Sequence, residues 1–169
     1  SSCAVYKVEE LTVPFMESDL LGENQYWGAY GLNKIKAEDH YESFIRNTDA
    51  KLISIRPPYV YGENNYAQRE SFIFEHIINN QPILIPKSNC SLQFIYTTDL
   101  ANIIKTLLNE SSLDKINVFN VGNEEAITAK KWIEYCFEAV KGKTSIIEYD
   151  YIATGRGVRD FFPFPDYDN

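Results

Sequence analysis

Short apolar runs alternate with helical patterns along this 169-residue chain. Runs such as "LISI", "ILIP" and "INVFNVG" are rich in branched residues, which is typical of strands inside a sheet. The segments between them carry apolar residues at the spacing of a helix, as in "AKKWIEYCFEAV". Because strand–helix–strand alternation makes successive strands parallel, the pattern predicts an α/β fold with a mostly parallel sheet.

The chain is expected to begin with the end of a strand over 1–6. Further strands are expected over 51–56, 83–86, 92–96 and 116–122, and the segment 145–151 closes the regular pattern. Helices are expected over 27–47, 69–80, 100–108 and 129–140. Thr97 or Thr98 is expected to cap the third helix, and Thr128 the fourth. Residues 14–24 read as a polar loop.

Composition excludes several classes of protein. No apolar run is long enough to cross a bilayer, and the start does not resemble a signal peptide. The net charge of -8 argues against binding a nucleic-acid backbone. Cys3, Cys90 and Cys136 are isolated, as in reduced cytosolic proteins, and His40 and His76 lack companions for a metal site. We expect a cytoplasmic protein with no metal and no membrane partner.

The first predicted helix carries a stripe that is apolar except for one charge. Its members follow at spacings of three and four: Trp27, Tyr30, Lys34, Ala37, Tyr41 and Phe44. This stripe is expected to face the core. Lys34 is then either a lysine that extends past the core to water, beside a packed Tyr30, or part of a site.

Tyr30 and Lys34, one turn apart, suit proton transfer at a carbon bearing a hydroxyl. A phenol is a poor base at neutral pH, but a neighbouring ammonium favours the phenolate. Ser2, at a strand end, could hold the substrate oxygen. A chain with 12 tyrosines contains about one Y-x-x-x-K by chance, so the bare motif leaves both interpretations open.

Several motifs in a fixed order add context. They are "SSCAVY", a loop with Pro14 and Glu17, "YGLNKIKAE", "ISIRPPYVYGENN", "FIYTTDLANII" and "NVFNVGNEEAIT". From the central catalytic strand onward, the chain resembles extended short-chain dehydrogenases/reductases of the NAD-dependent epimerase/dehydratase family. The resemblance covers nearly the whole chain.

This resemblance implies the C-terminal part of a Rossmann-type parallel sheet with a small α/β substrate-binding region. Residues 1–60 would finish the dinucleotide-binding domain, and 61–169 would mainly bind substrate, with some segments returning to the sheet. The implied activity is transient hydride transfer on a sugar nucleotide or related hydroxyl substrate, with NAD or NADP, in a homodimer.

The resemblance also assigns roles to residues. The implied catalytic residues are Ser2, Tyr30 and Lys34. The implied cofactor-binding residues are Tyr30, Lys34, Pro57 and Pro58. The implied substrate-binding residues are Ser2, Tyr59, Asn64, Asn65 and Gln93, although Asn64 and Asn65 also suit a simple turn. Cys3, beside Ser2, is either a nucleophile or a buried thiol.

The glycine-rich turn that binds cofactor phosphates is not found in the sequence. The only G-x-G is Gly155-Arg156-Gly157, and Asp160 stands where the third glycine belongs. We therefore expect a fragment that lacks the N-terminal nucleotide-binding half, with the cofactor bound mostly by that half and with no activity of the fragment alone.

Two positions depart from the pattern of sugar-nucleotide epimerases. Leu92 stands where they carry a phosphate-binding arginine, and Tyr59 replaces an asparagine. The stretch that begins "NNYAQRE" resembles a branch that includes chloroplast stem-loop RNA-binding proteins. The alternative function is therefore a non-catalytic RNA-binding or scaffold protein on the same fold.

Overall fold

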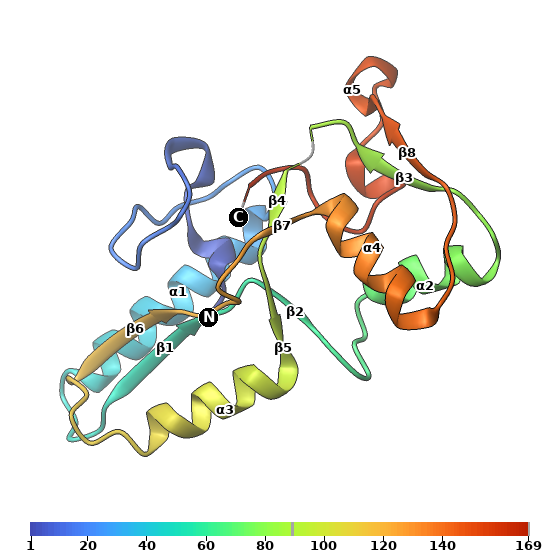
Figure 1. The fold of residues 1–169 in the computed structure, drawn as a ribbon. Coiled ribbons are helices and arrows are strands. Elements are labelled where there is room, and N and C mark those ends of the chain that lie inside the picture. Colours follow the sequence, from blue (N-terminus) through green and yellow to red (C-terminus); the bar gives the residue numbers. More distant parts are fainter. Residues whose placement is uncertain (89, 169) are drawn as a thin grey trace. The chain divides into compact units, whose positions relative to one another are not determined.

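The computed structural model describes residues 1–88 and 90–168, and it divides into two compact units (Figure 1). The first unit contains Ser1–Gly62 and Phe94–Glu124. The second contains Glu63–Gln93 and continues from Glu125 to Asp168. Both units combine helices with parallel strand pairs, which confirms the predicted α/β class.

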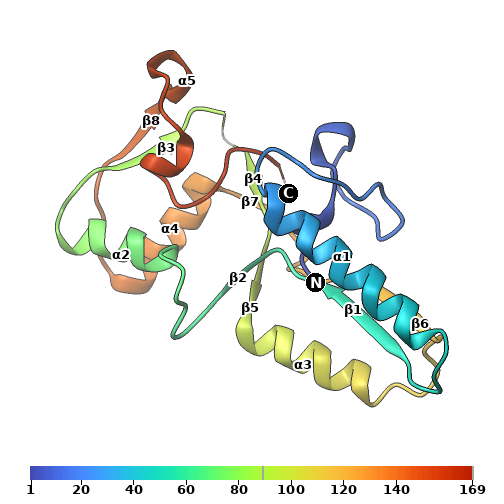
Figure 2. The same ribbon diagram turned by 180° about the vertical axis from the view of Figure 1, so that it is seen from behind.

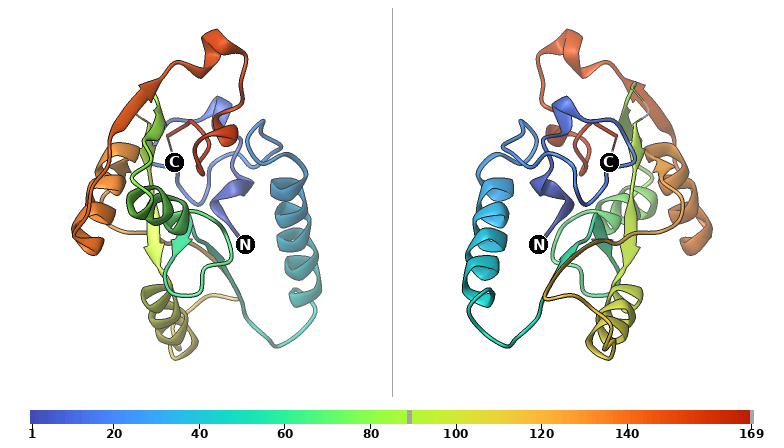
Figure 3. Two further views of the ribbon diagram at one scale, coloured as in Figure 1. Left: turned by 90° about the vertical axis from the view of Figure 1, so that its right-hand side faces the viewer. Right: turned by 90° about the vertical axis from the view of Figure 1, so that its left-hand side faces the viewer.

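The first unit is built on two parallel strand pairs. Its strands are β1 (Leu52–Arg56), β2 (Tyr59–Tyr61), β5 (Phe94–Tyr96) and β6 (Ile116–Asn120). Its helices are α1 (Gly28–Ile45) and α3 (Thr97–Leu108). β1 pairs with β6 so that Arg56 lies opposite Asn120, and β2 pairs with β5. Figure 3 shows α1 on one side of the β1–β6 pair and α3 on the other.

The second unit joins a parallel and an antiparallel strand pair to a pair of helices. Its strands are β3 (Ile83–Pro86), β4 (Ser91–Leu92), β7 (Ile127–Thr128) and β8 (Ile146–Tyr149). Its helices are α2 (Glu70–Ile78), α4 (Ala129–Val140) and the short α5 (Tyr151–Thr154). β3 pairs with β8 in parallel, and β4 with β7 antiparallel. Helices α2 and α4 lie side by side (Figures 1 and 2).

Most predicted elements form at their predicted places. The helix over 129–140 begins at its predicted cap, where the Thr128 hydroxyl accepts a hydrogen bond of 3.2 Å from the Lys131 amide. Gly155 has φ 68° and ends α5, so the lone G-x-G belongs to a helix end. In the described part of the chain, no helix has the length and apolar character that a membrane crossing needs.

The prediction of a strand end over residues 1–6 is wrong. Cys3–Val5 forms a 3₁₀ helix, and the Ser2 hydroxyl accepts a hydrogen bond of 3.2 Å from the Ala4 amide. A serine that bonds to a nearby backbone amide offers the chain an alternative to the ladder of a sheet. Ser2 itself keeps an extended backbone at the start of this turn.

The predicted strand over 92–96 is divided at Gln93. Its first part pairs with β7 and its second part with β2, so the segment changes partners within a few residues. The predicted threonine cap of α3 is also wrong. Strand β5 runs directly into the helix, so Tyr96 occupies the cap position and Thr97 is already helical.

The predicted orientation of α1 is wrong as well. Tyr30, Tyr41 and Phe44 are 49%, 58% and 64% exposed, whereas Gly31 and Ile45 are buried. The helix is turned because an ideal Cβ at Gly31 would lie 2.4 Å from the Ala4 carbonyl oxygen, so the two backbones are in close contact there. A bulky aromatic residue could not fit at this position.

We expect Gly31→Ala to destabilise the protein, although alanine favours a helix over glycine by about 1 kcal/mol. The added methyl overlaps backbone and must force a shift, which typically costs about 1–3 kcal/mol. Urea unfolding measures the change. Gly22→Ala is the control, because its Cβ would meet only the flexible Lys7 side chain, at 3.2 Å. Gly31→Ala with unchanged or higher stability would contradict the close contact.

Candidate active site

The segment that carries Ser2 is held against the end of β1. The Cys3 amide donates a hydrogen bond of 3.0 Å to the carbonyl of Pro57, the residue after β1. From the other side, the buried Asn24 amide donates to the carbonyls of Ala4 (3.1 Å) and Tyr6 (2.8 Å). The Ser2 hydroxyl accepts from Ala4, so its own proton remains available for a substrate oxygen.

Helix α1 brings Tyr30 and Lys34 to the same region. The Lys34 Nζ lies 5.4 Å from the centre of the Tyr30 ring. The contact between Gly31 and Ala4 places this turn of the helix directly against the segment that carries Ser2. Trp27 lies 5.9 Å from the Tyr30 ring and 6.2 Å from the Tyr59 ring, between ring centres. The first unit therefore gathers the segments that carry Ser2, Tyr30, Lys34, Pro57, Pro58 and Tyr59.

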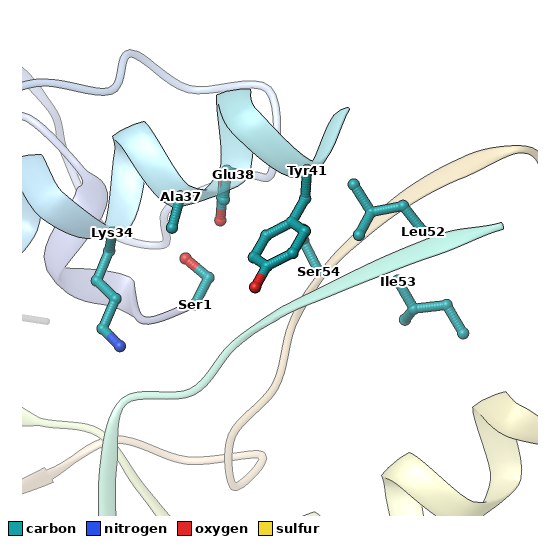
Figure 4. A pocket seen from close by; sticks show the side chains of 8 residues that line it. All are labelled: Ser1, Lys34, Ala37, Glu38, Tyr41, Leu52, Ile53 and Ser54. Atoms are coloured by element: carbon teal, nitrogen blue, oxygen red, sulfur yellow. The ribbon is translucent and has the colours of Figure 1, made fainter. Parts of the chain in front are cut away.

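Beside this pair lies a cavity of about 490 Å³, which is within the usual range for small-molecule sites. Figure 4 shows Lys34, Glu38 and Tyr41 extending from α1, with Ser1 between them and β1 beyond. Leu52, Ile53 and Ser54 of β1 complete the lining, together with Ala37 of α1. The cavity combines an apolar wall with an ammonium, a carboxylate and hydroxyl groups, a lining suited to a ligand that has both a ring and hydroxyls.

A buried ion pair between Arg56 and Glu38 links β1 to α1 beside the cavity. The side chains of Arg56 and Glu38 are 4% and 12% exposed. Arg56 donates from Nε to Glu38 Oε1 at 3.0 Å and from Nη2 to Oε2 at 2.6 Å. Burial alone would raise the pKa of Glu38, but hydrogen bonds from Arg56 and Ser1 hold that pKa below its ordinary value. The carboxylate is therefore ionised at neutral pH.

The ion pair continues into a hydrogen-bonded network. Arg56 Nη1 donates to the Tyr6 hydroxyl at 2.9 Å and to the Glu17 carbonyl at 3.0 Å. The Tyr6 hydroxyl donates to Asn120 Oδ1 at 2.7 Å, and the Asn120 amide donates to Glu17 Oε1 at 2.8 Å. Burial raises the pKa of Tyr6 despite the bond from Arg56. This network joins α1, β1, β6 and the loop before α1.

The sequence prediction missed Glu38, Arg56, Tyr6 and Asn120. Two signals were available in the sequence. Arg56 is a charge that directly follows an apolar run, and a buried charge requires a partner. Glu38 lies one turn beyond Lys34 and is therefore a neighbour of the predicted site.

The other predicted substrate residues lie in the second unit. Asn64 has φ 62°, and the Asn65 amide donates hydrogen bonds of 3.1 Å to each Glu70 carboxylate oxygen. Asn65 Oδ1 also accepts from the Ala67 amide, which is the turn geometry that asparagine favours. Gln93 is half-buried between β4 and β5. A substrate role for these three residues stays a prediction.

The thiol of Cys3 is a hydrogen-bond donor with little nucleophilic character. Its Sγ donates to the Arg56 carbonyl at 3.1 Å, and burial raises the pKa of Cys3 to about 12. Burial likewise raises the pKa values of Cys90 and Cys136 to about 12. The buried-thiol interpretation of Cys3 is favoured over the nucleophile.

We expect all three native thiols to react with a disulfide reagent at pH 8 at least about a hundredfold more slowly than a free thiol, because the thiolate is the reactive form. Unfolding in urea should restore ordinary rates. Tyr66→Cys provides an exposed control, since Tyr66 is 98% exposed. Fast labelling of a native Cys3 would contradict the assignment.

Comparison with known proteins identifies the family of the chain. The model of the "NAD dependent epimerase/dehydratase family" matches residues 1–122. An Arabidopsis thaliana protein named "Chloroplast stem-loop binding protein of 41 kDa b, chloroplastic" is 25% identical over 90% of this chain and 40% of its own length. The "dTDP-4-dehydro-6-deoxyglucose reductase" of Escherichia coli is 29% identical over 72% of this chain and 38% of its own length.

Solved structures show the same fold. The UDP-N-acetylglucosamine 4-epimerase from Bacillus cereus superposes with a TM-score of 0.72 at 22% identity, over 89% of this chain and 50% of that one. The chain thus spans about two-fifths of the curated relatives and half of this solved chain.

Proposed function

Because the chain belongs to the NAD-dependent epimerase/dehydratase family, we propose that it carries the acid–base residues of an enzyme acting on a hydroxyl group of a sugar nucleotide. The observation that carries the proposal is the Lys34 Nζ at 5.4 Å from the Tyr30 ring centre, against the segment that carries Ser2. As the phenolate, Tyr30 takes the hydroxyl proton of the substrate and becomes the neutral phenol, Lys34 stabilises the phenolate before this transfer, and Ser2 donates a hydrogen bond to the substrate oxygen.

The cavity beside Lys34 fits one part of a nicotinamide dinucleotide, since its ammonium and hydroxyls suit ribose and its apolar wall suits a ring. NAD or NADP, when bound, supplies the acceptor and donor of hydride. We propose that Tyr30, Lys34, Pro57 and Pro58 contact it. The glycine-rich phosphate turn is not in this sequence, so tight binding would require further polypeptide.

The proposed substrate class follows from the names of the relatives, which include enzymes of UDP- and dTDP-linked sugars. We propose that the first unit carries the chemistry and that Tyr59 bounds the sugar there. For Asn64, Asn65 and Gln93 of the second unit, a role in binding substrate is likewise only proposed. The protein is proposed to act in the cytoplasm as a homodimer.

We expect Tyr30→Phe, in the full-length native protein, to lower turnover of UDP-N-acetylglucosamine with NAD at least about a hundredfold, because it removes the acid–base group. Lys34→Met should also lower turnover, because the phenolate loses its cation. Turnover and melting temperature are measured together.

The matched control is Tyr135→Phe. Tyr135 is a similarly exposed helical tyrosine in the second unit, with Lys131 Nζ 4.7 Å from its ring centre. This variant should keep wild-type turnover. A folded Tyr30→Phe protein with full turnover would show that Tyr30 is not the acid–base group.

The second candidate function is RNA binding, which the named Arabidopsis relative motivates. With a net charge of -8, we expect no salt-sensitive affinity for RNA. A gel shift with a stem-loop RNA at low and physiological salt measures it. An affinity that falls at least about tenfold between these salts would support a basic RNA-binding face and the alternative.

A further inference from the structure

Glu38 lies on the same line of α1 as the proposed acid–base pair. Tyr30, Lys34 and Glu38 follow one another at intervals of one turn, so the direction of one constrains the others. The Glu38 carboxylate accepts two parallel hydrogen bonds from Arg56, and such a fork fixes direction as well as distance. Arg56 therefore fixes the rotation of α1 about its axis where Lys34 and Tyr30 project.

The other side of Arg56 reaches the segment that carries Ser2. Arg56 Nη1 donates to the hydroxyl of Tyr6, which is fully buried and lies four residues after Ser2. Between them, the 3₁₀ helix Cys3–Val5 is closed by the Val5 and Tyr6 amides, which donate to the Ser2 and Cys3 carbonyls. A continuous path of contacts, Glu38–Arg56–Tyr6, thus joins the helix of the acid–base pair to the serine segment.

Stability alone does not explain an ion pair in this place. Removing two charges from water costs several kcal/mol, and buried pairs can often be replaced by apolar residues without loss of stability. The two parallel hydrogen bonds also fix the relative orientation of the Arg56 and Glu38 side chains, which apolar packing would fix less precisely. We propose that Glu38 and Arg56 are positioning residues, which hold the Ser2 hydroxyl in register with Tyr30 and Lys34. This inference rests on the function proposed for those three residues.

The test replaces both members of the ion pair by methionine, which fills nearly the same volume without charge. In the full-length native protein, with UDP-N-acetylglucosamine and NAD as probes, Glu38→Met/Arg56→Met should lower kcat at least about tenfold, since small displacements of reacting groups have large effects on rate. KM for UDP-N-acetylglucosamine should stay within about twofold, because Ser2 and Tyr59, which are proposed to contact this substrate, are retained. The control is Glu42→Met/Arg46→Met, which removes an exposed ion pair from the same helix and should leave both constants unchanged.

Arg56→Lys separates the effect of the positive charge from the effect of the two parallel hydrogen bonds, because lysine keeps the charge but cannot donate both bonds in this fixed geometry. We expect Arg56→Lys to lower kcat by a similar factor to the double variant. If the double variant does not fold, Arg56→Lys alone tests the positioning role. Full kcat in a folded Arg56→Lys protein would overturn the positioning role, as would full kcat in the folded double variant.

Hydrogen exchange gives a readout that does not depend on turnover. In the folded double variant, the Val5 and Tyr6 amides should exchange at least about tenfold faster, because their segment loses its tie to α1. The amides of α1 itself should keep their protection. Unchanged exchange at Val5 and Tyr6 would overturn the coupling even if the wild type turned over neither probe. Lack of wild-type turnover would count against the proposed function alone.

Discussion

The buried charge of Arg56 is the constraint on which the first unit depends. A guanidinium that is almost fully removed from water requires compensation of both its charge and its N–H groups. Glu38 supplies the charge from α1, while Tyr6 and the Glu17 carbonyl accept further hydrogen bonds from separate segments. These segments are distant in sequence, so satisfying one side chain brings together the helix, the strand and the loops around the proposed site.

A second constraint is the contact between Gly31 and Ala4. The Ala4 carbonyl occupies the space that any side chain at position 31 would need, which allows the helix to lie close to the serine segment. Together with the ion pair, it decides which side of α1 packs inward. The aromatic residues Tyr30, Tyr41 and Phe44 are therefore left partly open to solvent.

Periodicity in the sequence was sufficient to predict the elements of this fold but not their partners. The helix over 129–140 and its Thr128 cap depend on local spacing, and both are found where expected. The division at Gln93 depends on which strands lie on either side, which local patterns do not contain. The orientation of α1 was mispredicted for the same reason. Apolar spacing favoured the aromatic stripe as the buried face, whereas the contact of Gly31 with Ala4 and the buried ion pair of Arg56 place a different face of the helix inward. For the candidate site, the motif order led to the proposal of Ser2, Tyr30 and Lys34. The sequence marks Arg56 only as a charge that needs a partner, and which side chain supplies that partner depends on tertiary contacts.

The pairing of strands that are distant in sequence also affects the order in which the chain can fold during synthesis. Each unit is assembled from two stretches of sequence, with the second unit interrupting the first after Gly62. Strand β1 pairs with β6, which follows it by about sixty residues, and contacts of such long separation delay folding because the intervening loop must close first. During translation, β1 cannot pair fully with β6 until Asn120 has left the ribosome. The hydrogen bond from the Tyr6 hydroxyl to Asn120 can form only then. The hydrogen-bonded network that supports the proposed site is therefore completed only after Asn120 has been made.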